Sequence, residues 1–100
     1  MLVKKLTVQL PRGLQAKHTT LFIRQAFTFQ SEIVLGKHGK TTSGTDLMGI
    51  MDLAVEEGDE VILMTDGIDE QVANQMLENF LVNGYIFKEE VKDVMGSLKG

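Results

Sequence analysis

The chain of 100 residues contains no cysteine, which excludes disulfide bonds and thiolate chemistry and is typical of a cytosolic protein. No segment approaches the roughly 20 apolar residues that cross a membrane, and residues 1–5 lack the apolar run of a signal peptide. Basic residues are scattered, and ten Lys and Arg against fourteen Asp and Glu give a formal net charge of −4. We therefore expect a cytoplasmic protein that binds neither a membrane nor nucleic acid directly.

Residues that hold metals or act as nucleophiles are also scarce. The two histidines, His18 and His38, have no partner at a metal-ligand spacing, so no metal or other cofactor is expected. No Gly-x-Ser-x-Gly motif marks an activated serine. Residues 36–41 resemble a phosphate-binding loop, but Val34 stands where that motif needs its first glycine, so we interpret them as a hairpin turn. We do not expect an enzyme.

Hydrophobic residues make up 43% of the chain, enough for the core of one small domain. Alternation of apolar and polar residues predicts strands, and apolar stripes with helical spacing predict helices. The expected elements are a strand over 2–10, a helix over 16–29, strands over 32–35 and 41–43, a helix over 47–53, a strand over 60–65 and a helix over 70–83. This order, βαββαβα, favours an α+β fold with helices on one face of an antiparallel sheet.

Cap residues and local composition refine the predicted limits of these helices and strands. Asp46 and Asp69 are the expected N-caps of the second and third helices, and Gly84 is the expected C-cap. The almost continuous apolar run at 60–65 predicts a central strand. We place the domain at residues 1–85 and a C-terminal extension at 86–100, with a weak helix over 88–98.

The start of the first helix is the most suggestive local feature. Gly13 forms a turn that leads directly into the helix. Unpaired backbone N–H groups and the positive end of the helix dipole converge at such a junction, which favours an anion. If ancestors of this chain handled phosphate, we expect the phosphate here.

The second predicted helix carries two methionines on one side. Leu47, Met48 and Met51 share that side, whereas Ile50 and Leu53 lie on the other and can serve the core. Methionine adapts its shape and is common where one surface meets several partners. The triplet is either packed in the core or exposed as an apolar docking patch.

Several stretches together resemble a known family. They are Gly13-Leu14-Gln15-Ala16-Lys17-His18-Thr19-Thr20-Leu21-Phe22, Gly39-Lys40, Asp46-Leu47-Met48-Gly49-Ile50-Met51, Leu53-Ala54-Val55, Asp66-Gly67 and Asp69-Glu70. From residue 1 to about 85 the chain resembles HPr, the histidine-containing phosphocarriers of the bacterial sugar phosphotransferase system. The resemblance implies an open-faced β-sandwich, with a four-stranded antiparallel sheet and three helices on one face.

The resemblance also assigns roles to four positions at which this chain departs from the family. It implies that the phosphoacceptor histidine falls on Gln15, a phosphate-holding arginine on Lys17, a proline on His18 and a regulatory serine on Asp46. An amide nitrogen has its lone pair delocalised into the carbonyl and cannot carry phosphate. Lysine keeps the positive charge but lacks the planar fork of arginine. Asp46 offers a kinase no hydroxyl, and it either caps a helix or mimics a phosphoserine incompletely.

Glutamine in the context Gly-Leu-Gln-Ala is similar to the Crh subgroup, from which Asp46 departs. The resemblance implies a non-catalytic regulatory or adaptor protein in carbon catabolite regulation, with a LacI-type catabolite repressor or another phosphotransferase-system protein as partner. The expected partner-binding residues are Leu14, Gln15, Lys17, Leu47, Met48 and Met51. Two alternatives stay open: a divergent phosphocarrier that uses His18, and a vestigial HPr-like protein that forms a homodimer through residues 85–100.

Overall fold

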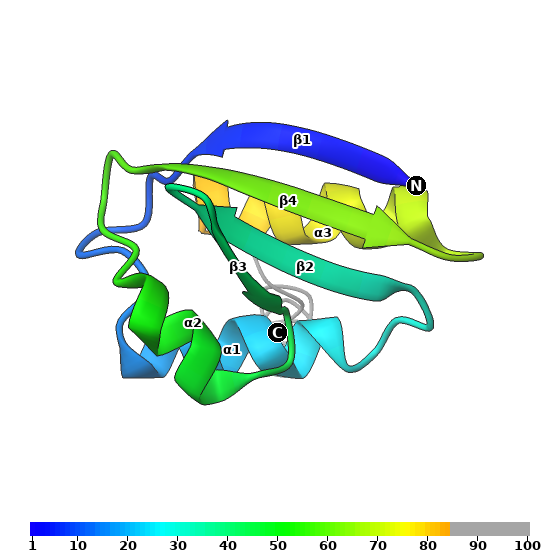
Figure 1. The fold of residues 1–100 in the computed structure, drawn as a ribbon, viewed down its shortest axis with the longest axis horizontal. Coiled ribbons are helices and arrows are strands. Elements are labelled where there is room, and N and C mark those ends of the chain that lie inside the picture. The colour runs from blue at the N-terminus through cyan, green and yellow to red at the C-terminus, as the bar shows by residue number, and fades with distance from the viewer. Residues whose placement is uncertain (85–100) are drawn as a thin grey trace, which may run out of the picture.

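The computed structural model of the chain describes residues 1–84, which form a four-stranded antiparallel sheet and three helices (Figure 1). In chain order the elements are β1 (Leu2–Thr7), α1 (Ala16–Ala26), β2 (Glu32–Lys37), β3 (Lys40–Ser43), α2 (Leu47–Leu53), β4 (Glu60–Asp66) and α3 (Glu70–Asn83). The predicted α+β class and the order βαββαβα are confirmed. The helix predicted over 88–98 and the dimer contact considered for residues 85–100 lie outside the described residues.

The strands lie in the order β1-β4-β2-β3, so β4 is central, as its apolar run predicts. The helices pack on one face of the sheet, with α3 against β1 and β4, and with α1 against both other helices (Figure 1). Alternation along β4 directs Val61, Leu63 and Thr65 toward the helices. Its other apolar residues face away, and Ile62 is 46% exposed because no element among the described residues covers that face.

β1 ends at Thr7, three residues before the predicted end of the strand. Val8 and Leu10 are still buried alternately, as in a strand. Their backbone has left the sheet, however, because the N–H of Val8 donates to Asp59 O (2.8 Å) and the N–H of Gln9 donates to Leu81 O (2.9 Å). Alternation reports burial, and it continues wherever an extended chain keeps one side against the core.

α1 ends at Ala26 rather than at residue 29. After it, Thr28 N–H bonds to Gln25 O (3.0 Å) and Phe29 N–H to Ala26 O (3.3 Å). These hydrogen bonds join residues three apart and so tighten the last turn, as is common at helix ends. Phe29 still packs against the core, which explains why the apolar stripe in the sequence runs past the helix.

Asp69 occupies the predicted N-cap position of α3, but its side chain makes no capping hydrogen bond. Its carboxylate accepts the N–H groups of Gln30 (2.8 Å) and Ser31 (2.9 Å) and the Ser31 hydroxyl. These hydrogen bonds, the Ser31 hydroxyl first among them, lower the pKa of Asp69 below its ordinary value. Asp69 therefore links the loop after α1 to the start of α3. The predicted C-cap is confirmed, since Gly84 adopts the left-handed conformation with φ +76°.

Replacing Asp69 by asparagine should lower the urea midpoint of unfolding at neutral pH and flatten its dependence on acid pH. Because the folded-state pKa is lowered, the carboxylate stabilises the fold above the unfolded-state pKa of about 3.9 and stops doing so as pH falls through the folded-state value. Urea titrations from about pH 6 to about pH 3 measure this. Asp52→Asn, at an exposed carboxylate, is the matched control and should leave the urea midpoint at neutral pH unchanged. Equal slopes in Asp69→Asn and wild type would contradict the assignment.

Candidate functional site

The start of α1 is held against the end of α2. Gly13 has φ +67°, and a Cβ placed on it would collide with the carbonyl oxygen of Val55. The N–H of Leu14 donates to that same oxygen at 2.9 Å. Only a residue without a side chain fits at position 13, and its close approach brings the two helices together.

Gln15 is the N-cap of α1 and its side chain is exposed. Its backbone is extended (φ −76°, ψ 176°), and its carbonyl accepts the first helical hydrogen bond, from Thr19 N–H at 2.7 Å. Its side chain forms no capping hydrogen bond. The first-turn N–H groups of α1 therefore have no acceptor among the described residues, as is usual for a helix start. The anion-attracting geometry expected from the sequence is present, with an amide side chain beside it.

His18 points inward from the first turn of α1. Its Nδ1 lies 3.1 Å from Gly13 O, and a carbonyl only accepts, so Nδ1 carries the proton. The ring is partly buried and meets the ring of Phe80 edge-on, with centroids 6.2 Å apart. One ring nitrogen is thus hydrogen-bonded to the turn before the helix, and the ring itself packs toward α3.

Leu14 does not belong to an exposed surface, contrary to our expectation. It is 5% exposed and lies in the core. Its carbonyl oxygen accepts a hydrogen bond from the buried Thr19 hydroxyl at 3.1 Å. Both its N–H and its carbonyl oxygen are therefore hydrogen-bonded. The sequence pattern does not reveal this burial, because a residue in a turn has no periodic neighbours that set its direction.

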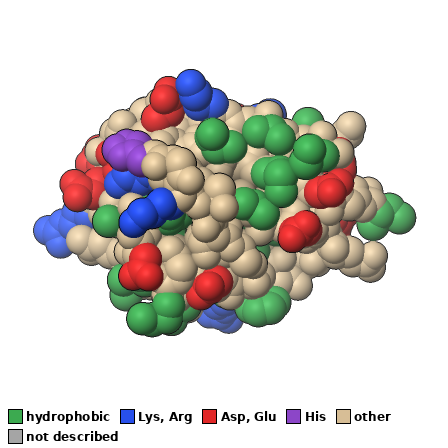
Figure 2. Space-filling view, viewed as in Figure 1, with side chains coloured by type: hydrophobic (Ala, Val, Ile, Leu, Met, Phe, Trp, Pro, Cys, Tyr) green, Lys and Arg blue, Asp and Glu red, His purple; other side chains and the backbone are tan. Residues whose placement is uncertain are grey.

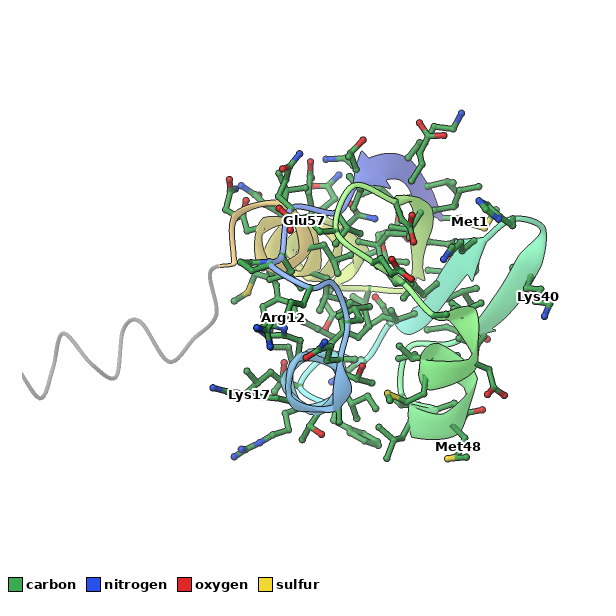
Figure 3. The ribbon with its side chains drawn as sticks, turned by 90° about the vertical axis from the view of Figure 1, so that its left-hand side faces the viewer. Met1, Arg12, Lys17, Lys40, Met48 and Glu57 are labelled. Atoms are coloured by element: carbon green, nitrogen blue, oxygen red, sulfur yellow. The ribbon has the colours of Figure 1, made fainter. Side chains whose placement is uncertain are left out.

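Two cations lie near this helix start. Lys17 and Arg12 are both exposed, and Figure 3 shows their side chains on the same side of the start of α1. Arg12 adopts φ +65°, so the turn directs it there. Sequence reasoning passed over Arg12, although it supplies the planar guanidinium that Lys17 lacks.

Asp46 caps α2 as predicted. Its Oδ1 accepts the N–H of Gly49 at 3.0 Å, and its backbone is extended (φ −99°, ψ 101°). The carboxylate remains exposed while it makes this contact. It therefore places a carboxylate at the start of α2, where the helix dipole favours negative charge.

The predicted sides of α2 are confirmed, and the apolar triplet is exposed rather than buried. Leu47 is 45% exposed, Met48 69% and Met51 39%, whereas Ile50 is fully buried and Leu53 is 7% exposed. α2 packs beside α1, and Figure 3 shows Met48 reaching into solvent from α2 while Lys17 points away from it on the far side of α1. We call Leu47, Met48 and Met51 the α2 patch.

A lysine missed by sequence reasoning stabilises the end of α2. Lys37 Nζ donates to Ala54 O (2.7 Å) and forms an ion pair with Asp59 (2.7 Å), and its side chain is only 14% exposed. The hydrogen bond from Lys37 is the main reason that the pKa of Asp59 is lowered. Ala54 is left-handed, with φ +50°, and the ammonium group holds its carbonyl. Residues 36–41 thus belong to the β2–β3 hairpin, as predicted, and Lys37 of this hairpin also supports α2.

Residues 1–84 contain no group of three or more His, Asp or Glu placed to hold a metal ion. Within this same part of the chain, none of the helices has the length and apolar content needed to cross a membrane.

Comparison with known proteins identifies relatives of this fold. A family model described as the PTS HPr component phosphorylation site matches residues 2–83. The HPr-like protein Crh of Halalkalibacterium halodurans is 41% identical over 81 residues, covering 81% of this chain and 96% of that protein. A phosphocarrier protein HPr from Bacillus anthracis superposes with a TM-score of 0.78 at 35% identity, covering 80% of this chain and 95% of that one. A Bacillus subtilis Crh structure, a dimer with a swapped domain, gives 0.65 at 41% identity, covering 81% and 93%.

The fold and the site define a class of small open-faced β-sandwich proteins in which an accessible helix start lies beside an apolar helix patch. The chain belongs to the PTS-HPr family, and the resemblance noted in its sequence is confirmed. It is an HPr-like protein related to the phosphotransferase system.

Substitution of Asp46 tests its structural role separately from any charge effect. Asp46→Ala should lower the free energy of unfolding by about 1 kcal/mol, because the N–H of Gly49 loses its acceptor. Asp46→Ser should lose much less, since a serine hydroxyl also caps helices. Urea unfolding at pH 7 measures both. Equal losses in the two variants would show that the hydrogen bond contributes nothing to stability.

Proposed function

We propose that this chain is a non-catalytic regulatory or adaptor protein of the HPr and Crh kind that acts in carbon catabolite regulation. The observation that carries this proposal is the exposed α2 patch beside a helix start whose cap residue is glutamine. An exposed apolar patch of this kind suits protein binding, and glutamine stands where the resemblance implies the phosphoacceptor histidine.

The chemistry of position 15 supports a loss of phosphate transfer. Gln15 is exposed at the junction where a phosphate would meet the first-turn N–H groups of α1. Its amide nitrogen is not nucleophilic, so no phosphoramidate forms there. The electrostatics of an anion site persist with Lys17 and Arg12 nearby, but the covalent step has no acceptor.

The alternative carrier, His18, is poorly placed for the same step. Its Nδ1–H is hydrogen-bonded to Gly13 O and its ring packs on Phe80, so phosphorylation of Nδ1 would break the hydrogen bond and introduce charge against the core. Transfer through Nε2 requires that a partner reach a partly buried ring. We therefore favour the adaptor over the carrier.

The proposed docking surface has an apolar centre and a polar rim. The α2 patch forms the centre, since apolar side chains that exclude water supply most of the affinity of an interface. Asp46, the N-cap of α2, and Gln15, the N-cap of α1, form the proposed rim. Lys17 lies at the outer margin, on the far side of α1 (Figure 3). Buried Leu14 is not part of this surface.

The partner that we propose is a LacI-type catabolite repressor or another phosphotransferase-system protein. The fixed carboxylate of Asp46 supports this choice, because it supplies part of the charge that a phosphoserine would present at the start of α2. It carries one negative charge, against about −1.5 to −2 for a phosphate, so the complex would form without a kinase but with fewer hydrogen bonds.

Removal of the methionine side chains should weaken the complex. In calorimetric titration of the chain against a purified LacI-type repressor, Met48→Ala with Met51→Ala should raise Kd about tenfold or more, because the apolar centre is lost. Ile68→Ala is the matched control, since Ile68 is 89% exposed but lies outside the surface, and it should leave Kd unchanged. Absence of binding by the wild type, or an unchanged Kd in the double variant, would refute the proposed surface.

A phosphorylation assay separates the adaptor from the carrier. Incubated with phosphoenolpyruvate and the first enzyme of the phosphotransferase system, the wild type should gain no acid-labile phosphate. Gln15→His with Lys17→Arg should gain it, because the imidazole restores a nucleophile at the helix start and the guanidinium restores a planar donor. Phosphate on the wild type that disappears in His18→Ala would establish the carrier instead.

A further inference from the structure

The face of the sheet away from the helices carries an apolar patch that the proposed function does not use. The strand register pairs Val3 with Met64 and Met64 with Val34, while Ile62 stands in the next row. Val3 is 55% exposed and Ile62 46%, whereas the β4 residues that point toward the helices are buried. We call Val3, Val34, Ile62 and Met64 the open-face patch. Figure 2 shows hydrophobic side chains gathered over the sheet on this face, and a contiguous apolar area of this kind is typical of an interaction surface.

The patch borders a shallow hollow. Gly36 lies in register with Ile62 on one side and Thr41 on the other, and its missing side chain lowers the surface between them. Residues of the open-face patch line the same hollow. A ridge of side chains along one side of a helix fits a surface of this shape, because helices pack by placing ridges into grooves.

The chain leaves α3 close to the edge of this face. The N–H of Gln9 donates to Leu81 O at 2.9 Å, so the last turn of α3 lies against the segment that follows β1 (Figure 1). β1 is an edge strand, so the route from Gly84 to the open face passes around one strand only. Packed layers lie about 10 Å apart, and residues 85–90 span up to about 20 Å when extended. This segment is therefore long enough to cross from the helix side to the open face.

The sequence after this crossing supplies an apolar ridge. Its apolar residues recur three and four apart, which places them on one side of a helix. They are Val91, Val94, Met95 and Leu98. Eight residues of helix are about 12 Å long, and the part of β4 from Ile62 to Asp66 covers about 13 Å. The ridge thus matches the open-face patch in both length and chemistry.

We propose that residues 91–98 form a short helix that docks on the open-face patch of their own chain. The helix runs in the direction of β4, with Val91 over Ile62 and Leu98 beyond Met64. A short linker gives it an effective concentration of about 1 mM or more at the patch, whatever the protein concentration. An isolated helix of this length is marginal in water, so it forms only when docked. The α2 patch stays free, because α2 packs on β2 and β3 from the helical side.

Charge at the far end of the patch supports this direction. Glu32 and Asp66 pair in register there, and both are exposed. Figure 2 shows acidic side chains at one end of the hydrophobic group. Asp66 lies 3.5 Å from the amine of Met1, whereas Glu32 has no ion pair within residues 1–84. Lys99 directly follows the apolar ridge, so docking in this direction brings its ammonium group to these carboxylates.

A spin label on the docking segment tests where it lies. The chain has no cysteine, so Ser97→Cys provides a single labelling position, and residue 97 is off the apolar ridge. In the 15N-labelled full chain, a nitroxide there should broaden the amide signals of Val3, Glu32 and Met64 much more than that of Met48 on α2. The same sample with the nitroxide reduced is the reference. Broadening that is absent, equal on all faces or centred on the helices would overturn the proposal.

Substitution in the patch tests the contact itself. Ile62→Lys should abolish the broadening and lower the hydrogen-exchange protection of residues 91–98 about tenfold or more, because it places a charge under the docked helix. Val72→Lys is the matched control, since Val72 is 48% exposed on α3, and it should leave both unchanged. Circular dichroism confirms that each exposed substitution leaves the sheet and helices folded. Protection and broadening that persist in Ile62→Lys would overturn the proposal.

Exchange of charges tests the direction of the helix. Glu32→Lys and Lys99→Glu should each lower the exchange protection of residues 91–98 about two- to fivefold, as expected for an exposed ion pair. The double variant restores opposite charges and should recover most of the protection. A double variant that is protected no better than the single variants would refute the placement of Lys99 beside Glu32.

Mixing separates docking within one chain from contact between copies. Spin-labelled Ser97→Cys without 15N is mixed in equal amount with 15N-labelled wild type, so broadening then reports only contacts between molecules. The sheet signals should stay sharp, because each helix docks on its own chain. Broadening of Val3 and Met64 in the mixture would overturn the proposal in favour of contact between copies.

Discussion

The hydrogen bond from Leu14 N–H to Val55 O is the contact on which the candidate site depends. It exists because Gly13 has no Cβ and adopts φ +67°, so that the turn before α1 approaches the backbone after α2. Through this contact the start of one helix and the exposed side of another become neighbours. The first-turn N–H groups, Gln15 and the α2 patch thus form one end of the domain rather than separate features.

One-sided coverage of the sheet has a second consequence. Because the helices pack on a single face, the domain has two accessible surfaces of different origin. The helix side presents the α2 patch and the charges around it, and the opposite side presents Val3 and Ile62 on the sheet. The surfaces do not overlap, so a partner on one leaves the other available.

Periodicity predicted the helical side of the molecule well. The spacing of Leu47, Met48 and Met51 against Ile50 identified which side of α2 meets the core, since helical residues three and four apart share a side. Alternation was less reliable for β1, because Val8 stays buried after the backbone has left the sheet. The N-cap position of Asp69 was predicted correctly, but the contacts of its carboxylate were not. A carboxylate before a helix suits an N-cap, but here the Asp69 carboxylate accepts three donors from the loop after α1, a distant part of the chain.

The sequence by itself determined the chemistry of this protein. A glutamine at position 15 and the lack of cysteine remove a nucleophile whatever the fold, because nucleophilicity belongs to the side chain. Tertiary structure decided which residues are accessible. Leu14 is buried by the approach of two loops, and Ile62 and Met64 lie on a face that no element of residues 1–84 covers, although the run from Val61 to Met64 is wholly apolar. Exposure depends on which distant element packs on each face, and strand periodicity contains no information about that partner.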